Sequence, residues 1–294
     1  MQMSRRAAIL LFSIVILAWG MNWTVVKLIV LEVPPLWSAV LRTGIAAVTV
    51  FVVQCATGQF VIPKRHDVNI VLVIGVINMA VAPALMAAGL QFMPAGRSIV
   101  LGYTTPLWVA PGAWFFLHEK LPRRRLVGII IGMCGVVVLC NPLALYQGNS
   151  DVLIGTALLL LNAFSWAVGI LCIRAYVWLS TPFQLLFWQT LLGTLLLLLP
   201  ALAVEGVPSF TLTPSLALLL AYSGIPATAL AVWAMTVINS CLPAATTSLS
   251  VLATPVVGIF SAVIFLGESV DMPLVVATGL ILGGIALGTI PARK

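Results

Sequence analysis

The chain alternates between long apolar runs and short polar breaks, and this pattern predicts its secondary structure. Most runs are about 20 residues long, the length that a helix needs to cross a hydrocarbon core of about 30 Å. The breaks contain proline, glycine or clustered charges, which end helices. Ten membrane-spanning helices are predicted, near residues 7–29, 36–56, 68–89, 95–117, 124–141, 152–174, 183–204, 214–237, 244–266 and 273–290.

The composition supports a membrane location. Of the 294 residues, 62% are hydrophobic and 7% are charged, against about 45–50% and about 25% in soluble domains. Ten spans with tight loops would use nearly the whole chain, so we expect an all-α integral membrane protein. The first run, residues 7–31, is longer than the apolar core of a signal peptide and is expected to remain as the first helix.

The net charge of +7 is interpreted as a topology signal and not as a nucleic-acid interface. If the N-terminus lies in the cytoplasm, most of the basic residues fall on the cytoplasmic side. This agrees with the excess of Lys and Arg that short cytoplasmic loops carry in membrane proteins. Both termini are then cytoplasmic. The residues on that side are Arg5, Arg6, Lys64, Arg65, Lys120, Arg123, Arg124, Arg125, Arg174, Arg293 and Lys294.

A segment of the first half returns in the second half. Pro94–Glu119 and Pro243–Glu268 share proline, Phe-Leu and glutamate positions at a spacing of 149 residues. A polar stretch, residues 147–151, separates two sets of five helices, so we predict two repeats, residues 1–146 and 147–294. An odd number of spans inverts the second repeat in the membrane. The charges agree, because the loop after the first segment is strongly basic and its counterpart has no basic residue.

Two glycine pairs follow these segments. Gly128 and Gly132 match Gly279 and Gly283, and glycines four residues apart let another helix backbone approach closely. We predict tight packing of the fifth and tenth helices on each other or on a second subunit, which gives a monomer or a weak homodimer. The alternative is the general use of glycine in membrane helices.

The order of these motifs resembles the drug/metabolite transporter superfamily, in its ten-helix, EamA-type branch. The resemblance rests on the W-G-x-N-W run at Trp19–Trp23, the proline-containing fourth and ninth helices, the F-L-x-E endings at Glu119 and Glu268, and the G-x-x-x-G helices. It covers essentially the whole chain. It implies a bacterial inner-membrane exporter of metabolites, with amino acids, aromatic ones included, among the substrates.

Two helix faces resemble each other and are candidates for solute contact. Trp19 and Asn22 share a face in the first helix, and Asn162 and Trp166 share one in the sixth. Each face offers an amide that donates and accepts hydrogen bonds, beside an indole that can stack on a planar solute or cover an ammonium group. The alternative is that each asparagine bridges two helices.

Further residues are predicted to complete the wall of an adaptable, mainly apolar pocket. For each of them a purely structural role is the alternative. They are Asn78, Met86, Tyr103, Trp233 and Ser248.

Prolines mark possible bends in the helices. Pro106 and Pro255 weaken their helices locally and are predicted hinges, with a fixed kink as the alternative. Pro83 and Pro226 are expected to interrupt the third and eighth helices at different depths.

Charged side chains inside the spans are few. All seven acidic residues lie at predicted helix ends or in loops, so we expect a facilitator or exchanger, with proton-coupled drug or metabolite efflux as the alternative. Glu119 and Glu268 are expected to anchor helix ends. Arg42 lies within the second span, and we expect it to extend outward along lipid rather than to bind a solute carboxylate.

Other functions find less support. The histidines, His66 and His118, lie in loops, and no Ser/His, Cys/His or H-E-x-x-H arrangement indicates an enzyme. The five cysteines form no C-x-x-C pair, so no metal, cofactor or disulfide framework is expected. A lipid-handling membrane protein remains as an alternative. The expected partners are a small solute and the lipid bilayer.

Overall fold

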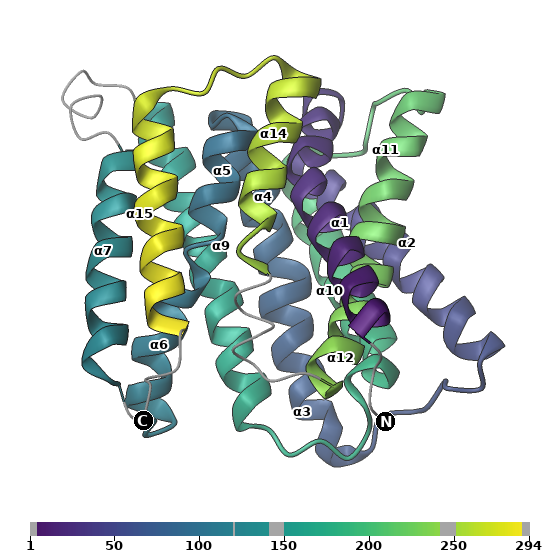
Figure 1. Ribbon diagram of the computed structural model, residues 1–294. Coiled ribbons are helices and arrows are strands. Elements are labelled where there is room, and N and C mark those ends of the chain that lie inside the picture. Colours follow the sequence, from purple (N-terminus) through teal and green to yellow (C-terminus); the bar gives the residue numbers. More distant parts are fainter. Residues whose placement is uncertain (1–4, 120, 141–149, 242–250, 290–294) are drawn as a thin grey trace.

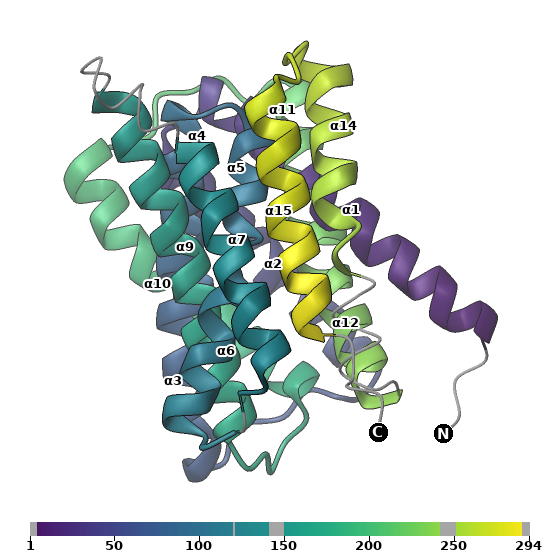
Figure 2. The same ribbon diagram turned by 60° about the vertical axis from the view of Figure 1, so that its left-hand side comes forward.

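The computed structural model describes residues 5–119, 121–140, 150–241 and 251–289, and these parts of the chain contain helices and no strand. The helices stand side by side in one bundle (Figures 1 and 2). The elements are α1 (Arg5–Glu32), α2 (Pro35–Ala56), α3 (Arg65–Ile74), η1 (Gly75–Val81), α4 (Ala82–Phe92), α5 (Ala95–Gly102), α6 (Thr105–Phe116), α7 (Arg123–Cys140), α9 (Ser150–Ala175), α10 (Pro182–Pro200), η2 (Ala201–Glu205), α11 (Pro214–Gly224), η3 (Ile225–Leu230), α12 (Ala231–Cys241), α14 (Thr254–Leu266) and α15 (Met272–Thr289).

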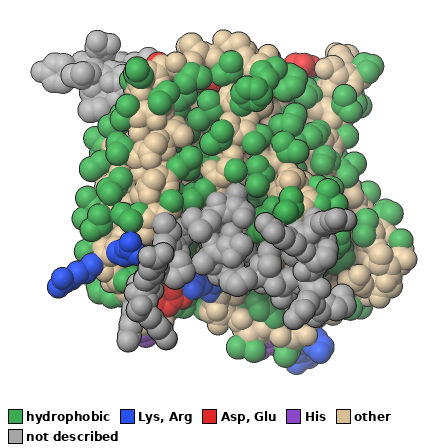
Figure 3. All heavy atoms as spheres, viewed as in Figure 1, with side chains coloured by type: hydrophobic (Ala, Val, Ile, Leu, Met, Phe, Trp, Pro, Cys, Tyr) green, Lys and Arg blue, Asp and Glu red, His purple; other side chains and the backbone are tan. Residues whose placement is uncertain are grey.

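Six helical segments are long and apolar enough to cross a membrane, and the shorter helices α14 and α15 are apolar as well. Hydrophobic side chains cover much of the face shown in Figure 3, and Lys and Arg side chains lie in its lower part. The start of α1 and the end of α15 lie at this same end of the bundle (Figures 1 and 2). The expected all-helical, multi-pass membrane protein is therefore the observed fold class.

The fourth and ninth predicted spans are broken at equivalent places. α5 ends at Gly102 and α6 begins at Thr105, whereas α14 begins at Thr254 after a turn at residues 252–253. The two Thr-Pro steps are 149 residues apart in the sequence. Pro106 and Pro255 each stand in the first turn of the following helix, where a missing N–H costs least. The duplicated segment thus carries a duplicated helix break.

Threonine hydroxyls satisfy the carbonyls at the first break. Pro106 has no N–H to donate to the carbonyl of Gly102, and the hydroxyl of Thr105 lies 2.9 Å from that carbonyl oxygen instead. The hydroxyl of Thr104 donates to the carbonyl of Leu101 at 2.6 Å. Lipid offers no replacement for a lost hydrogen bond, so this compensation allows the break to exist within a membrane.

The third and eighth spans bend without breaking. Pro83 is the second residue of α4, which follows the π-helical segment η1, and Pro226 lies within the π-helical segment η3. The expected interruptions take the form of a wider π-helical turn in each span, through which the helix continues. Such turns are frequent at functional sites.

Carboxylates join the start of one helix to the end of another. Glu205, at the end of η2, accepts hydrogen bonds from the backbone N–H groups of Leu36 at 2.8 Å and Trp37 at 3.0 Å, in the first turn of α2. Glu268, just after α14, accepts from the N–H of Ala95 at 2.6 Å in the first turn of α5. Both carboxylates accept hydrogen bonds from N–H groups that have no partner within the helix. Their negative charge is also stabilised by the partial positive charge at the start of the helix. The expectation that Glu268 anchors a helix end is confirmed.

Glycines bring α7 and α15 into direct backbone contact. A Cβ atom built on Gly284 would lie 2.4 Å from the carbonyl oxygen of Gly128 and 2.8 Å from the backbone nitrogen of Gly132. The predicted contact between the fifth and tenth helices is confirmed. The predicted register on α15 is wrong, because Cβ atoms on Gly279 and Gly283 would meet nothing within 4 Å. The contact uses the neighbouring face of α15, which carries Gly284.

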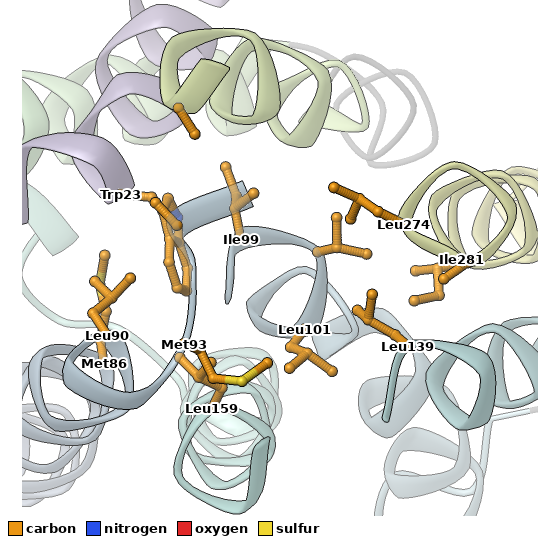
Figure 4. Close-up of a cluster of buried hydrophobic side chains, with 14 of the residues drawn as sticks. Trp23, Met86, Leu90, Met93, Ile99, Leu101, Leu139, Leu159, Leu274 and Ile281 are labelled. Atoms are coloured by element: carbon orange, nitrogen blue, oxygen red, sulfur yellow. The ribbon is translucent and has the colours of Figure 1, made fainter. Parts of the chain in front are cut away.

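The main hydrophobic core surrounds α5. Ile99 and Leu101 are fully buried, and Trp23, Leu139 and Ile281 belong to the same cluster (Figure 4). These residues come from α1, α5, α7 and α15, so the core joins the two halves of the chain. α5 thus provides a packed support beside the helix break at its end.

Candidate solute-binding site

The indole of Trp19 is fixed on the π-helical segment η3. Its Nε1–H donates to the carbonyl oxygen of Ala227 at 3.1 Å, and the side chain is partly buried. A π-helical turn displaces carbonyl groups from the regular ladder and makes them available to side chains. The indole edge is thus used by the protein, and the ring packs against a buried cluster that includes Phe12, Val15 and Ile238. Stacking of a planar solute on the indole stays a prediction.

Arg42 points into the bundle and not toward lipid. Its Nε–H donates to the hydroxyl of Thr228 at 3.0 Å, and its Nη1 lies 3.6 Å from the sulfur of Met86. Thr228 and Met86 are both buried. The expectation that Arg42 extends outward along lipid is therefore wrong. The guanidinium instead connects α2 to η3 and α4.

The sequence does contain a signal for this orientation. Ala39 and Ala46 lie one turn before and one turn after Arg42, and both are almost fully buried. Residues at these spacings share one face of a helix. Small residues on both sides leave room for a long side chain between packed helices.

Two predicted asparagines are buried with incomplete hydrogen bonding. Asn22 is 3% exposed and Asn78 is 2% exposed, and neither Oδ1 atom has a hydrogen-bond partner among the described residues. Asn78 also occupies the space beside Gly169, where an added Cβ would lie 1.8 Å from its Oδ1. A buried acceptor without a partner is costly, so each of these oxygens offers a place for a donor.

Asn162 bridges two helices. Its Nδ2–H donates to the carbonyl of Ala82 at 2.7 Å, at the junction of η1 and α4. Ser165 likewise donates to the carbonyl of Ile77 within η1 at 3.0 Å. The structural alternative is therefore observed for Asn162. Trp166 lies one turn further along α9 and is partly buried, and solute contact by either residue stays a prediction.

The remaining predicted residues lie in different surroundings. Tyr103 is partly buried at the first helix break, and its hydroxyl lies near the side chain of Thr254 at the second break. Trp233 is 38% exposed on α12. Ser248 lies outside the described residues. The two broken helices thus meet at their breaks.

Contacts place four of the predicted residues, together with Arg42, in two groups. Trp19, Met86 and Arg42 lie around η3, whereas Asn78 and Asn162 lie between η1 and α9. The first group therefore lies at the π-helical segment η3 and the second at the π-helical segment η1. Among the described residues, no group of three or more His, Cys, Asp or Glu side chains could hold a metal ion.

Two apolar grooves lie apart from both groups. The first has a volume of about 480 Å³ and runs along α7, where it is lined by residues such as Ile130, Met133 and Val137. The second, of about 350 Å³, lies between α2, η1, α4 and α10. Neither groove is lined by a residue of the predicted site, and their walls suit lipid chains.

The chain matches one family model twice. The model of the EamA-like transporter family matches residues 6–141 and again residues 153–290. The chain belongs to the EamA-like transporter family. The resemblance seen in the sequence motifs is thereby confirmed, and family membership indicates a transporter rather than an enzyme.

Relatives of this EamA-like chain carry transporter names. A protein of Salmonella typhimurium, named "probable amino-acid metabolite efflux pump", is 30% identical, and the alignment covers 99% of this chain and 97% of the relative. An Escherichia coli protein of the same name is 27% identical, with 99% and 97% covered. The Bacillus subtilis "uncharacterized transporter YoaV" is 24% identical, with 94% of each chain covered.

A solved crystal structure shares the fold of this EamA-like protein. It superposes with a TM-score of 0.66 at 21% sequence identity and covers 97% of this chain and 98% of the other. This likeness shows the fold alone.

Proposed function

We propose that this protein exports small amphipathic metabolites, amino acids including aromatic ones, across the bacterial inner membrane. In this proposal, ten helices form two inverted five-helix repeats, residues 1–146 and 147–294, which alternate access to a site between them. The observation that carries the proposal is a set of contacts between corresponding helices of the two halves. In each contact, the start of the helix in the first half lies beside the end of its counterpart in the second half.

Three such contacts support the inverted arrangement. The start of α2 meets the end of η2 through Glu205, and the start of α5 meets the end of α14 through Glu268. Near the start of α7, Gly128 meets Gly284 toward the end of α15. Each pair joins the corresponding helices of the two halves, so the corresponding helices run antiparallel. A rocking motion between two such halves exposes a central site to each side in turn.

The broken helices supply places where the halves can bend. In the proposal, Pro106 and Pro255 act as hinges beside the solute site. Their equivalent positions in the first turns of α6 and α14 support a paired role. Trp19, Met86 and Tyr103 line the solute path in this proposal, which suits a substrate with an apolar body.

The positions of the acidic residues support transport driven by the solute gradient. Five carboxylates accept hydrogen bonds or form ion pairs at helix ends, and Glu32 and Asp151 lie in the last and first turns of their helices. A proton carrier would normally hold an ionisable residue within the membrane. We therefore propose a facilitator or exchanger, with proton-coupled efflux as the alternative.

The basic residues support the orientation. Arg5, Arg65 and Arg123 all begin helices, and the Lys and Arg side chains in Figure 3 gather at the end of the bundle where α1 starts. Short basic loops remain in the cytoplasm. We therefore place both termini in the cytoplasm.

Solute counterflow in proteoliposomes tests this function. Vesicles loaded with unlabelled phenylalanine or leucine should accumulate the labelled amino acid faster than protein-free vesicles. An imposed pH gradient should leave this exchange unchanged. Failure to transport any member of a panel of aromatic and aliphatic amino acids would contradict the proposal, and strict dependence on the pH gradient would favour proton-coupled efflux instead.

A further inference from the structure

Arg42 is a charged group inside the bundle without an acidic partner in the described part of the chain. Its guanidinium contacts the Thr228 hydroxyl at 3.0 Å and the Met86 sulfur at 3.6 Å, and both groups are neutral. The Thr228 hydroxyl is itself used, because it donates to the carbonyl of Ser223 at 2.8 Å. No acidic side chain among the described residues therefore pairs with the positive charge of Arg42.

Other cations within or near the spans are compensated. Arg97 pairs with Asp271, and Arg174 pairs with Glu119 at 2.5 Å. Lys27 donates to the carbonyl of Met93 at 3.2 Å and to a second carbonyl in the last turns of α4. Burying an unpaired charge is expensive. Arg42 differs from Arg97 and Arg174, which have acidic partners, and from Lys27, whose ammonium group lies near the Glu268 carboxylate. No acidic side chain of the described residues faces Arg42.

Packing alone does not require a cation at this position. The start of the seventh predicted span repeats that of the second, since Pro182 and Thr190 lie 147 residues after Pro35 and Thr43. In this alignment Arg42 corresponds to Gln189, which is 5% exposed and neutral. An amide thus suffices at the equivalent buried position. The positive charge is a feature of one half of the protein alone.

The surroundings of Arg42 suit a solute with one charged end and one apolar end. Trp19 binds the carbonyl of Ala227, and Arg42 binds the hydroxyl of the next residue, Thr228. The π-helical segment therefore holds an indole and a guanidinium one residue apart. A guanidinium can bind a carboxylate through two parallel hydrogen bonds, while an indole and Met86 offer contact to an apolar body.

We infer that Arg42 binds the carboxylate of the transported solute. The inference rests on the proposed function and narrows its substrate class to carboxylates with an apolar body, such as α-amino acids. Amines and uncharged compounds of the same shape are excluded as good ligands. Thr228 acts as a positioning residue, since it holds the Nε–H of the guanidinium; in this inference the solute carboxylate takes the place of the weak Met86 sulfur contact at Nη1.

A binding measurement on the purified protein tests this inference independently of transport. The probes are phenylalanine, 3-phenylpropionate and phenethylamine, which share a ring and differ in their charged groups. Intrinsic tryptophan fluorescence and the shift in melting temperature report binding. The two carboxylates should bind the wild-type protein, and phenethylamine should bind at least about tenfold more weakly.

Variants at position 42 separate charge from fold. Arg42→Gln introduces the residue found at the equivalent position and should weaken binding of both carboxylates by about 30-fold or more. Arg42→Lys keeps the charge and should retain part of the affinity, because an ammonium lacks the planar fork. Arg124→Gln, at an exposed position of α7, removes the same charge and should change nothing.

The outcomes distinguish this inference from the proposed function. Equal affinity of wild-type and Arg42→Gln for 3-phenylpropionate, or equal binding of phenethylamine and phenylalanine to wild-type, overturns the inference. Should Arg42→Gln fail to fold, comparison of wild-type with Arg42→Lys decides it, and unchanged carboxylate affinity in Arg42→Lys contradicts the forked contact. Carboxylate binding without counterflow leaves the role of Arg42 standing and contradicts the proposed transport.

Discussion

The contact between α7 and α15 allows a prediction with an internal control. Gly284 faces α7, whereas its neighbour Gly283 faces open space. Substitution by alanine adds one methyl group in both cases and raises helix propensity by about 1 kcal/mol in both. The two variants therefore differ only in what the new methyl group meets.

The clash at Gly284 follows from the geometry. A Cβ atom there would lie 2.4 Å from the Gly128 carbonyl oxygen, about 1 Å short of the 3.4 Å at which ordinary contacts begin. The blocking atoms belong to backbone, so the two helices must separate. Overpacking of this kind costs about 1–3 kcal/mol, and we expect the upper part of that range. Relative to Gly283→Ala, Gly284→Ala should thus lose about 2–3 kcal/mol of unfolding free energy.

Thermal unfolding of the detergent-solubilised protein measures this difference. A loss of about 2–3 kcal/mol corresponds to a melting temperature lower by about 4–10 °C. Gly283→Ala should unfold at the temperature of the wild-type protein or slightly above it. Equal melting temperatures for the two alanine variants would refute the backbone contact between α7 and α15.

Three further predictions concern the helix ends, the hinges and the indole. Glu268→Ala removes the carboxylate that accepts from the N–H groups in the first turn of α5 and should lower the unfolding free energy by about 1–2 kcal/mol. Denaturation in a graded detergent series measures this loss. An unchanged unfolding free energy would show that the cap contributes nothing. Pro106→Ala and Pro255→Ala should slow counterflow while leaving solute affinity nearly intact, and normal flux in both would rule out hinging. Trp19→Phe loses the hydrogen bond to the η3 backbone and should weaken phenylalanine binding by about tenfold or less. The control variant Trp114→Phe changes a side chain that is 55% exposed and should bind phenylalanine with the wild-type affinity. Equal affinities of the two variants would contradict a role for Trp19.

The first two helices could be located from the sequence to within three residues because lipid imposes one simple requirement. Every backbone group must be satisfied within the span, so a long apolar run becomes a helix. The first span was placed at residues 7–29, and α1 covers Arg5–Glu32. The second was placed at 36–56, and α2 covers Pro35–Ala56. Charge and proline mark the ends of α1 and the start of α2, and Gly58, with a positive φ, follows the end of α2.

Side-chain direction was predicted less well. Depth along a helix does not show which face a residue occupies, and this explains why Arg42 was expected to face lipid. The glycines of α15 show the same limit, since Gly283 and Gly284 are adjacent in the sequence and point about 100° apart on a helix. Only the packing of α7 on α15 decides which of them is buried.

Asparagine roles also depend on the neighbouring helix. Asn162 and Asn22 have similar sequence surroundings, each with a tryptophan on the same helix face. Asn162 nevertheless donates a hydrogen bond to a carbonyl of α4, whereas the Oδ1 of Asn22 has no hydrogen-bond partner among the described residues. The π-helical segment beside Asn162 creates that meeting point. A single sequence gives little sign of where a helix widens into a π-helical turn.

The threonines at the first helix break bear on how the membrane stays sealed. Thr104 and Thr105 place hydroxyls on the carbonyls of the break, so these carbonyls need no water molecule. A chain of water molecules at the centre of a bilayer would conduct protons and discharge the membrane potential. Because the break supplies its own hydrogen bonds, the helix can be bent at this point without opening such a leak.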